Sequence, residues 1–306
     1  MIRSPNGASY DLLKNNFIDI QSEYRKRQVQ ASTGKEFMDR SENVTEGAMA
    51  AEISREKEDT IQFQDNVRDA KAQIISTDDR VQDVVELLQK ASELATSAGN
   101  GTHPPEHRMD LAQELDGIIE QVFSLSETKF GDKYLFGGTQ TSLPPFTATR
   151  NAAGEITAIT ANSDAATELL KTQMNENTIT EYGLLASGTD GVFQDGGSVD
   201  VLANLIALRD ELALGNQPTA ANTDQLQENM DHVIGQLTTN AVKQQWFETQ
   251  ERRLADRELT QNMQLEDLQG ADLAAVMTEL AQLQTTYTAT MQMINKTSQM
   301  SIINFI

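Results

Sequence analysis

A heptad pattern through residues 53–98 constrains the fold of this chain more than any other feature. Apolar or small residues recur at alternating spacings of three and four, and the positions between them carry mainly Asp, Glu, Lys, Arg and Gln. This spacing places one narrow seam along a single long helix. A helix cannot bury such a seam by itself, so the pattern predicts partner helices of similar length. The two columns of the seam are Ile53, Thr60, Val67, Ile74, Val81, Leu88 and Ala95, and Phe63, Ala70, Thr77, Val84, Ala91 and Ala98.

Similar seams predict further helices on both sides of the long one. The first helix ends near Gly34, and the long helix begins near Val44. The next helix follows the break at Pro104, and the others lie after residue 200. The short loop before that next helix predicts that it folds back antiparallel onto the long helix. We expect the long seam to be covered by this helix and by the segment after Thr223, and the first helix to pair with the last.

Helical periodicity is lost between residues 131 and 199. This stretch contains nine of the 18 glycines and two of the six prolines, a composition typical of turns and short strands. Residues 147–160 predict a β-hairpin with an Asn-Ala-Ala-Gly turn, and residues 164–171 predict a short helix. An apolar strand over residues 134–136 is expected in the core where the chain passes into this insert. The segment that leads into the insert contains Tyr134, Leu135, Phe136, Gly137, Gly138, Pro144 and Pro145. The predicted fold is therefore mainly α, a long helical coiled-coil rod formed by N- and C-terminal segments, with a small β-containing insert domain in the middle.

Charge and composition exclude several classes of protein. The net charge of −22 argues against nucleic-acid binding, because such a chain repels phosphate. The absence of cysteine excludes disulfides, thiolate metal sites and a cysteine nucleophile. The first ten residues hold no continuous apolar run, so no cleaved signal peptide is expected. No apolar stretch is long enough to predict insertion in a membrane.

No arrangement of residues predicts catalysis. His103 and His107 are four residues apart, but the two prolines between them break the helix face that a zinc pair needs. We expect a helix-capping turn there. The acidic pairs at 78–79 and 266–267 are typical of solvated helix faces, and the sequence contains no phosphate-binding glycine loop or nucleophile elbow. The prediction is a protein that is not an enzyme and has no cofactor and no metal.

The two ends of the chain carry apolar residues that a single chain has little left to cover. Five of the seven residues 300–306 are apolar, whereas chain termini are usually polar and frayed. Two interpretations stay open: the ends pack only on each other, or they pack on copies or partners, because contiguous apolar surface marks association sites. The candidate interface residues are Tyr10, Leu13, Phe17, Ile20, Tyr24, Leu280, Leu283, Tyr287, Ile294, Ile302, Ile303 and Phe305.

Several segments resemble the bacterial flagellin family, and within it the hook-associated proteins that join the hook to the filament. The segment 134–146, which is similar to the start of the β domain in those junction proteins, is the most specific. The run that follows the Gly-Lys pair, residues 39–44, departs from the Ser-Asp-Asp-Pro-like run that is usual in the family. The other matching segments are 31–37, 87–102, 270–274 and 300–306.

The resemblance implies a structural subunit of the bacterial flagellum that lies outside the cell. Such subunits bind a cytoplasmic chaperone, pass unfolded through the flagellar export apparatus without a cleaved signal peptide, and fold at the distal tip. Copies would then form a ring between an adjacent hook-associated protein and the flagellin filament. The implied domains are residues 1–40 with 272–306 as an inner assembly domain of terminal helices, 41–130 with 200–271 as a helical rod, and 131–199 as a β-rich outer insert.

Three alternatives remain at this point. Filament flagellin shares the terminal helices, although the segment 134–146 favours the junction protein. An intracellular coiled-coil adaptor would use the same seams but would stay inside the cell. An enzyme in the insert is the third alternative, and no cluster of residues supports it.

Overall fold

The computed structural model describes residues 5–37, 43–162, 168–189, 191–197 and 199–303. Within these residues the chain forms six helices and eight short strands. The predicted mainly α fold with a small β-containing insert is therefore confirmed. In the same part of the chain, no helix combines the length and the apolar composition needed to cross a lipid bilayer.

The chain divides into two compact units. The first contains residues 1–59 and 257–306, and the second contains residues 60–256. Helices α2 (Val44–Ala98) and α5 (Ala220–Gln269) contribute residues to both units. The finer division into three domains stays a prediction.

Helix α2 carries the predicted seam. The helix begins at Val44, as expected, because the side chain of Asn43 accepts a hydrogen bond from the backbone N–H of Glu46 (3.3 Å). In the second unit every seam position from residue 60 to residue 98 is buried. This includes Thr77, whose hydroxyl donates to the carbonyl of Gln73 (2.8 Å) and is thereby satisfied within the helix.

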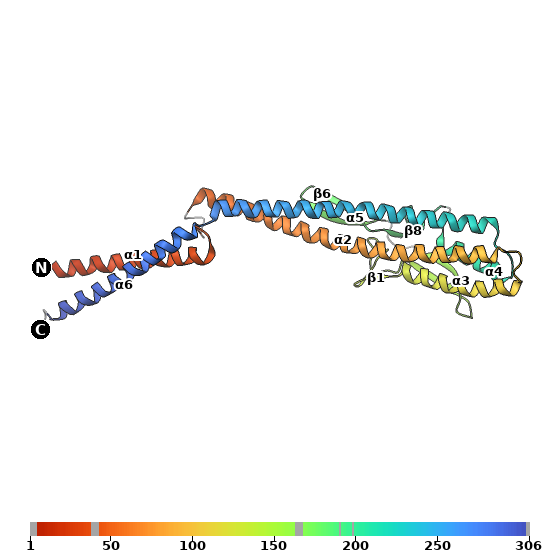
Figure 1. Ribbon diagram of the computed structural model, residues 1–306, viewed down its shortest axis with the longest axis horizontal. Coiled ribbons are helices and arrows are strands. Elements are labelled where there is room, and N and C mark those ends of the chain that lie inside the picture. Colours follow the sequence, from red (N-terminus) through yellow and green to blue (C-terminus); the bar gives the residue numbers. More distant parts are fainter. Residues whose placement is uncertain (1–4, 38–42, 163–167, 190, 198, 304–306) are drawn as a thin grey trace. The chain divides into compact units, whose positions relative to one another are not determined.

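Two helices cover this seam in the second unit, as predicted. Helix α3 (Pro105–Ser126) folds back beside the C-terminal part of α2 (Figure 1), where Lys90 pairs with Glu114 (3.1 Å). Helix α5 lies alongside α2 within this unit (Figure 1). Lys71 of α2 pairs there with Glu251 of α5 (2.9 Å). Helix α4 (Val201–Ala213) packs on α3.

Two apolar clusters form the core of the second unit. The larger cluster joins α2, α3 and α4 to the insert and includes Leu88, Leu115, Phe136, Phe193 and Leu205. The smaller cluster lies further along α2 and α5. Its buried members are Phe63, Val67, Ala70, Ile74, Met174, Phe247 and Leu254.

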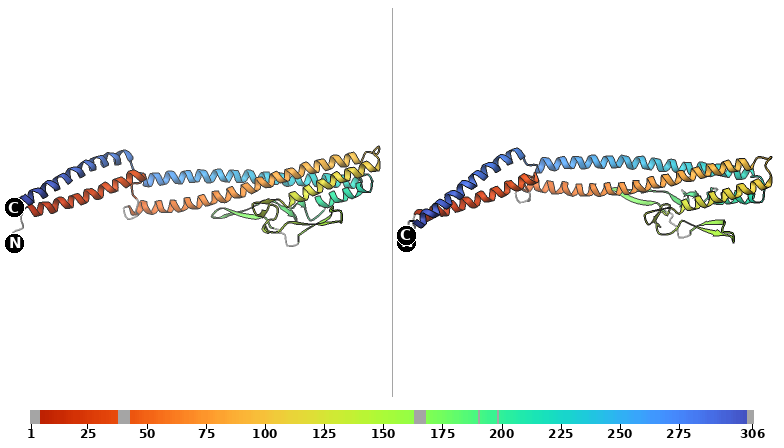
Figure 2. Two further views of the ribbon diagram at one scale, coloured as in Figure 1. Left: turned by 90° about the horizontal axis from the view of Figure 1, so that it is seen from below. Right: turned by 60° about the horizontal axis from the view of Figure 1, so that its bottom comes forward.

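The strands pair only two by two in the described residues. In both views of Figure 2 they lie on one side of α2 and α5 within the second unit. The antiparallel pairs are β1 (Lys129–Phe130) with β2 (Lys133–Tyr134), β3 (Phe146–Arg150) with β4 (Ile156–Ala161), and β5 (Leu170–Asn175) with β6 (Thr178–Tyr182). Strands β7 (Leu185–Ser187) and β8 (Gly191–Gln194) are parallel.

The β3–β4 pair is the hairpin that the sequence predicted. The side-chain oxygen of Asn151 accepts hydrogen bonds from the backbone N–H groups of Ala153 (2.9 Å) and Glu155 (3.0 Å). Gly154 has φ +95°, a backbone conformation that strains any residue with a Cβ atom. The turn residues therefore act as their types predict.

Two details of the insert were predicted wrongly. The predicted short helix over residues 164–171 is wrong at its C-terminal end, where Leu170 and Lys171 begin β5; residues 163–167 lie outside the described residues. In β5, half-buried and exposed side chains alternate up to the buried Met174, which is the period of a strand.

The expected strand over residues 134–136 is also shorter than predicted. Strand β2 ends at Tyr134, and the chain turns there because the N–H of Gly137 donates to the carbonyl of Tyr134 (3.2 Å). Leu135 and Phe136 are both buried. Consecutive strand residues point to opposite faces, so a turn is what allows both side chains to enter one core.

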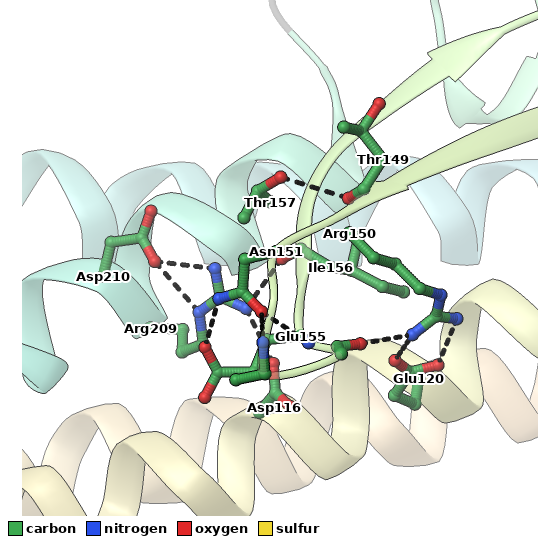
Figure 3. Close-up of polar contacts among 12 residues, drawn as sticks. Asp116, Glu120, Thr149, Arg150, Asn151, Glu155, Ile156, Thr157, Arg209 and Asp210 are labelled. Carbon is green, nitrogen blue, oxygen red and sulfur yellow. Dashed lines mark hydrogen bonds and ion pairs between the residues drawn. The ribbon is translucent and has the colours of Figure 1, made fainter.

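Arg209 of α4 ties the β3–β4 hairpin to the helices (Figure 3). Its Nη1 donates to Asp116 of α3 (2.7 Å) and to the carbonyl of Ile156 in β4 (2.7 Å), and its Nη2 donates to Asp210 (2.7 Å). Burial lowers the pKa of Arg209, but the hydrogen bonds to Asp116 and Asp210 outweigh this effect and raise it. The buried guanidinium therefore stays charged and paired.

Arg150, the cross-strand partner of Ile156, binds the other strand of the same hairpin to α3. Its guanidinium binds Glu120, with Nη2 2.9 Å from Oε2, and its Nη1 also donates to the carbonyl of Gly154 (2.8 Å). The end of the hairpin near its turn is thus held on α3 from both strands, by Arg150 and, through Asp116, by Arg209. This explains how a two-stranded sheet, which is marginal alone, keeps its position.

We predict that Leu88→Ala destabilises the second unit by about 2–5 kcal/mol, because it leaves a cavity at the centre of the α2 seam. Urea unfolding followed by circular dichroism measures this change. The matched control is Gln89→Ala at the exposed neighbouring position, which should change the free energy of unfolding by less than about 0.5 kcal/mol. Equal midpoints for the two variants would contradict the central place of this seam in the core.

Candidate assembly interface

Helices α1 (Pro5–Thr33) and α6 (Leu273–Ile303) lie side by side and antiparallel in the first unit (Figures 1 and 2). The ring of Tyr287 in α6 stacks against Phe17 of α1, with ring centroids 5.0 Å apart, and against Tyr24, at 6.2 Å. Phe17 and Tyr24 are seven residues apart and therefore share one helix face. An ion pair between Arg27 and Glu279 (2.8 Å) extends the contact.

A short backbone bridge closes this pair of helices at one end. Gly34 ends α1 with φ +70°, the left-handed conformation typical of a helix C-terminus. Beyond it, the N–H of Glu36 donates to the carbonyl of Gln269 (2.6 Å), and the N–H of Ala271 donates to the carbonyl of Gly34 (2.9 Å). The amide of Gln30 donates to the carbonyl of Glu36 (2.5 Å). The bridge thus joins two of the segments that carry the family resemblance.

Most of the predicted interface residues lie where α1 and α6 meet, and they are only half-buried. For Tyr10, Ile302 and Ile303 the structure describes the path of the helix alone, and Phe305 lies outside the described residues. Whether any of these residues contacts another copy stays a prediction. The half-buried residues are Leu13, Phe17, Ile20, Tyr24, Leu280, Leu283, Tyr287 and Ile294.

The extent of burial distinguishes this seam from the seam of α2. In the second unit, α2 is enclosed by two helices, and Ile74 and Leu88 have no exposed surface. Among the side chains described in α1 and α6, only Gln30 and Val276 are buried. Two helices cover only one side of each other, so a further layer of protein is needed to bury the rest.

A second set of apolar residues on the same two helices was not predicted from the sequence. They are exposed, and their spacing does not follow the predicted seam. One signal could have identified α6: it contains only two charged residues, Glu279 and Lys296, in a chain with a net charge of −22. The exposed residues are Leu12, Ile18, Val29, Met277, Met291 and Met293.

The segment that leads into the insert forms part of the core of the second unit. The ring of Phe136 meets Phe193 edge to face at 5.3 Å, and the carbonyl of Phe136 accepts from the N–H of Ala186 (3.1 Å). Gly137, Gly138 and Pro145 are buried with Leu135, whereas Tyr134 and Pro144 are half-buried. The segment follows α3 in the chain and is hydrogen-bonded to strand β7.

The histidines that were considered as metal ligands lie at the start of α3. The rings of His103 and His107 are 4.5 Å apart, and the N–H of His107 donates to the carbonyl of Pro104 (3.1 Å), which forms the first turn of the helix. In the described ranges, no three His, Cys, Asp or Glu side chains gather in a way that could hold a metal ion.

Residues 6–141 match the family described as the bacterial flagellin N-terminal helical region. Two curated relatives are both named flagellar hook-associated protein 3. The protein of Salmonella typhimurium is 29% identical over 160 residues, which are 51% of this chain and 50% of the relative. The protein of Escherichia coli is 30% identical over 128 residues, 41% of this chain and 40% of the relative. The chain thus spans half or less of the length of the curated relatives it matches.

Solved structures share the fold of this chain. A putative flagellar hook-associated protein from Vibrio parahaemolyticus has a TM-score of 0.64 at 17% identity, and the match covers 75% of this chain and 100% of that one. FlgL of Bacillus cereus has a TM-score of 0.55 at 19% identity, with coverage of 70% and 98%. The predicted resemblance to the flagellin family, and within it to hook-associated proteins, is confirmed.

We predict that Tyr287→Ala loosens α1 from α6 within the first unit, because it removes the ring that contacts both Phe17 and Tyr24. Each aromatic pair contributes about 0.5–1.5 kcal/mol beyond its burial, so amide hydrogen exchange in α1 should accelerate about tenfold. Gln292→Ala, at an exposed position of the same helix, is the control and should leave exchange unchanged. Unchanged exchange in the Tyr287 variant would show that this ring does not hold the two helices together.

Proposed function

We propose, from the flagellin N-terminal helical region that residues 6–141 carry, that this protein is a structural subunit of the bacterial flagellum. In this proposal its copies assemble outside the cell as a ring. The ring joins the hook, through another hook-associated protein, to the flagellin filament. The protein is not an enzyme in this role and needs no cofactor.

The incomplete burial of the α1–α6 pair is the observation that carries the proposal. Half-buried aromatic and aliphatic side chains line the contact between the helices, and exposed Met277 and Met291 lie on another side of α6. Burying apolar surface stabilises association by about 25 cal/mol per Å². The near absence of charge on α6 allows copies of a strongly acidic protein to approach there without repulsion.

Export and chaperone binding belong to the same proposal. A chaperone that covers the apolar faces of the terminal helices before export would prevent premature association inside the cell. The flagellar export apparatus would then carry the chain out without a cleaved signal peptide. The division into inner terminal helices, a helical rod and an outer insert is also part of this proposal. So are two expected absences: the protein does not bind nucleic acid, and it does not insert into a membrane.

Filament flagellin is the second candidate function, because it shares the N-terminal helical region. Two observations favour the junction protein. Both curated relatives are named hook-associated protein 3, and a structural neighbour with a TM-score of 0.51, from Legionella pneumophila, is described as the flagellar junction protein FlgL. An intracellular adaptor has no comparable support.

Deletion of the gene distinguishes these functions. We expect electron microscopy to show bare hooks and the medium to contain shed flagellin, because filament subunits would have no junction to attach to. Bare hooks without flagellin in the medium would instead identify the chain as the filament protein. Normal filaments, in a strain without a second copy of the gene, would reject a flagellar structural role.

We predict that the double substitution Met277→Glu and Met291→Glu leaves the monomer folded but prevents its incorporation into flagella. The two exposed side chains are 14 residues apart, on one face of α6, and carboxylates there would add charge repulsion between copies. Complementation of the deletion strain measures the effect as loss of motility, with circular dichroism confirming the fold. Met109→Glu, at an exposed position of α3, should retain motility. Motile cells carrying the double variant would remove α6 from the assembly contact.

A further inference from the structure

The β1–β2 hairpin presents an exposed aromatic side chain. Phe130 lies opposite Lys133 across a two-residue turn, in which Gly131 has φ +62°. Among the phenylalanines in the described ranges, only Phe130 is exposed, at 42% of its surface. Exposed aromatic residues of this kind are typical anchors of protein–protein contacts.

The hairpin is held in a fixed conformation. The N–H of Leu135 donates to the carbonyl of Thr128 (2.9 Å), and the N–H of Tyr134 donates to the carbonyl of Thr141 (2.8 Å). The ammonium group of Lys129 lies 4.4 Å from the centre of the Tyr134 ring. A contact made by this hairpin would therefore lose little conformational entropy on binding.

A groove of about 550 Å³ lies between α2 and α3 in the same unit. Half-buried Leu87 and Leu125 give it an apolar floor, and Phe130 of the same chain is not among its lining residues. The remaining lining residues, all polar or charged, are Asp83, Glu86, Lys90, Gln121 and Ser124.

The rim of the groove is acidic on balance. Asp83 pairs with Arg80 (2.7 Å), and Lys90 pairs with Glu114 (3.1 Å). Each of these ion pairs is neutral in itself. The carboxylate of Glu86 therefore gives the rim its net negative charge. The hairpin, by contrast, places Lys133 directly opposite Phe130 on one face, whereas the ammonium group of Lys129 lies against the Tyr134 ring.

We propose that the β1–β2 hairpin of one copy inserts Phe130 into the α2–α3 groove of a second copy. Lys133, the cross-strand partner of Phe130, then faces the rim that carries Glu86, so the apolar contact is flanked by opposite charges. Hairpin and groove are different patches of one chain, which makes the contact head-to-tail; such contacts form rings when the rotation between copies closes. The inference rests on the proposed function and names the surfaces through which the ring's subunits meet.

Cysteine cross-linking tests this contact in assembled flagella, because the chain has no cysteine of its own. The deletion strain is complemented with the double variant Asp132→Cys and Gln121→Cys, which places one thiol on the hairpin and one on the groove and keeps Phe130. Flagella are isolated and treated with a short bis-maleimide. We expect a ladder of covalent multimers on a denaturing gel.

The matched control places the hairpin thiol elsewhere. Ile179→Cys combined with Gln121→Cys uses an exposed residue of the β5–β6 hairpin and should give no ladder. A ladder of equal strength in the control, or no ladder in the test variant, would overturn the proposal.

A charge exchange gives a second, independent test without cysteines. We expect Lys133→Glu to reduce motility at least tenfold and the added substitution Glu86→Lys to restore it. Failure of the second substitution to restore motility would overturn the proposal. These results are separable from the proposed function, because bare hooks in the deletion strain would uphold the flagellar role even if the ladder and the charge rescue were absent.

Discussion

The covering of one narrow apolar seam is the physical condition on which the second unit depends. Helix α2 buries its seam from residue 60 to residue 98 only because α3 and α5 lie against it. A buried polar side chain also links α2 and α5. The buried amide of Asn240 in α5 donates to the carbonyl of Ile74 in α2 (3.1 Å), a bond that forms only when the two helices are in this register.

The strands depend on the helices in turn. Each described sheet has only two strands, too few to enclose a core. The β3–β4 hairpin is held by Arg209 and by the bond from Arg150 to Glu120, whereas the β5–β6 hairpin adds Met174 to the smaller cluster. The amide of Asn66 in α2 donates to the carbonyl of Gln173 in β5 (3.0 Å). The insert is therefore organised as extensions of the helical core.

In the first unit the apolar seam is also covered by helix packing, but by one helix instead of two. Helices α1 and α6 share a seam around Tyr287, but no third helix of the chain covers it among the described residues. Charge then decides which surfaces other copies can cover. In a chain with a net charge of −22, association is favoured where charge is scarce or balanced. The proposed contacts at α6 and at the β1–β2 hairpin both meet this condition.

The order, ends and partners of the helices could be predicted from the sequence, because heptad spacing and helix-ending glycines are local signals. The β3–β4 hairpin was predicted for the same reason, from its turn residues. The sequence could not distinguish a short helix from β5 near Lys171, since the period of the strand becomes visible only once Met174 is buried. It also predicted Tyr134 to Phe136 as one strand, because apolar composition does not show a turn that sends two adjacent side chains into one core.

The candidate interface shows the same division. Periodicity identified the aromatic residues of α1 and α6, and the family resemblance drew attention to the segments joined at Gly34 and Gly270. Only the tertiary structure showed that these seams remain half-buried, and that Phe130 stands outside the core while nearby Phe136 lies within it. Sequence determines which residues are apolar and how they are spaced, because these are properties of the chain. Exposure depends on how many neighbouring elements reach each side chain, and only the packed structure decides that.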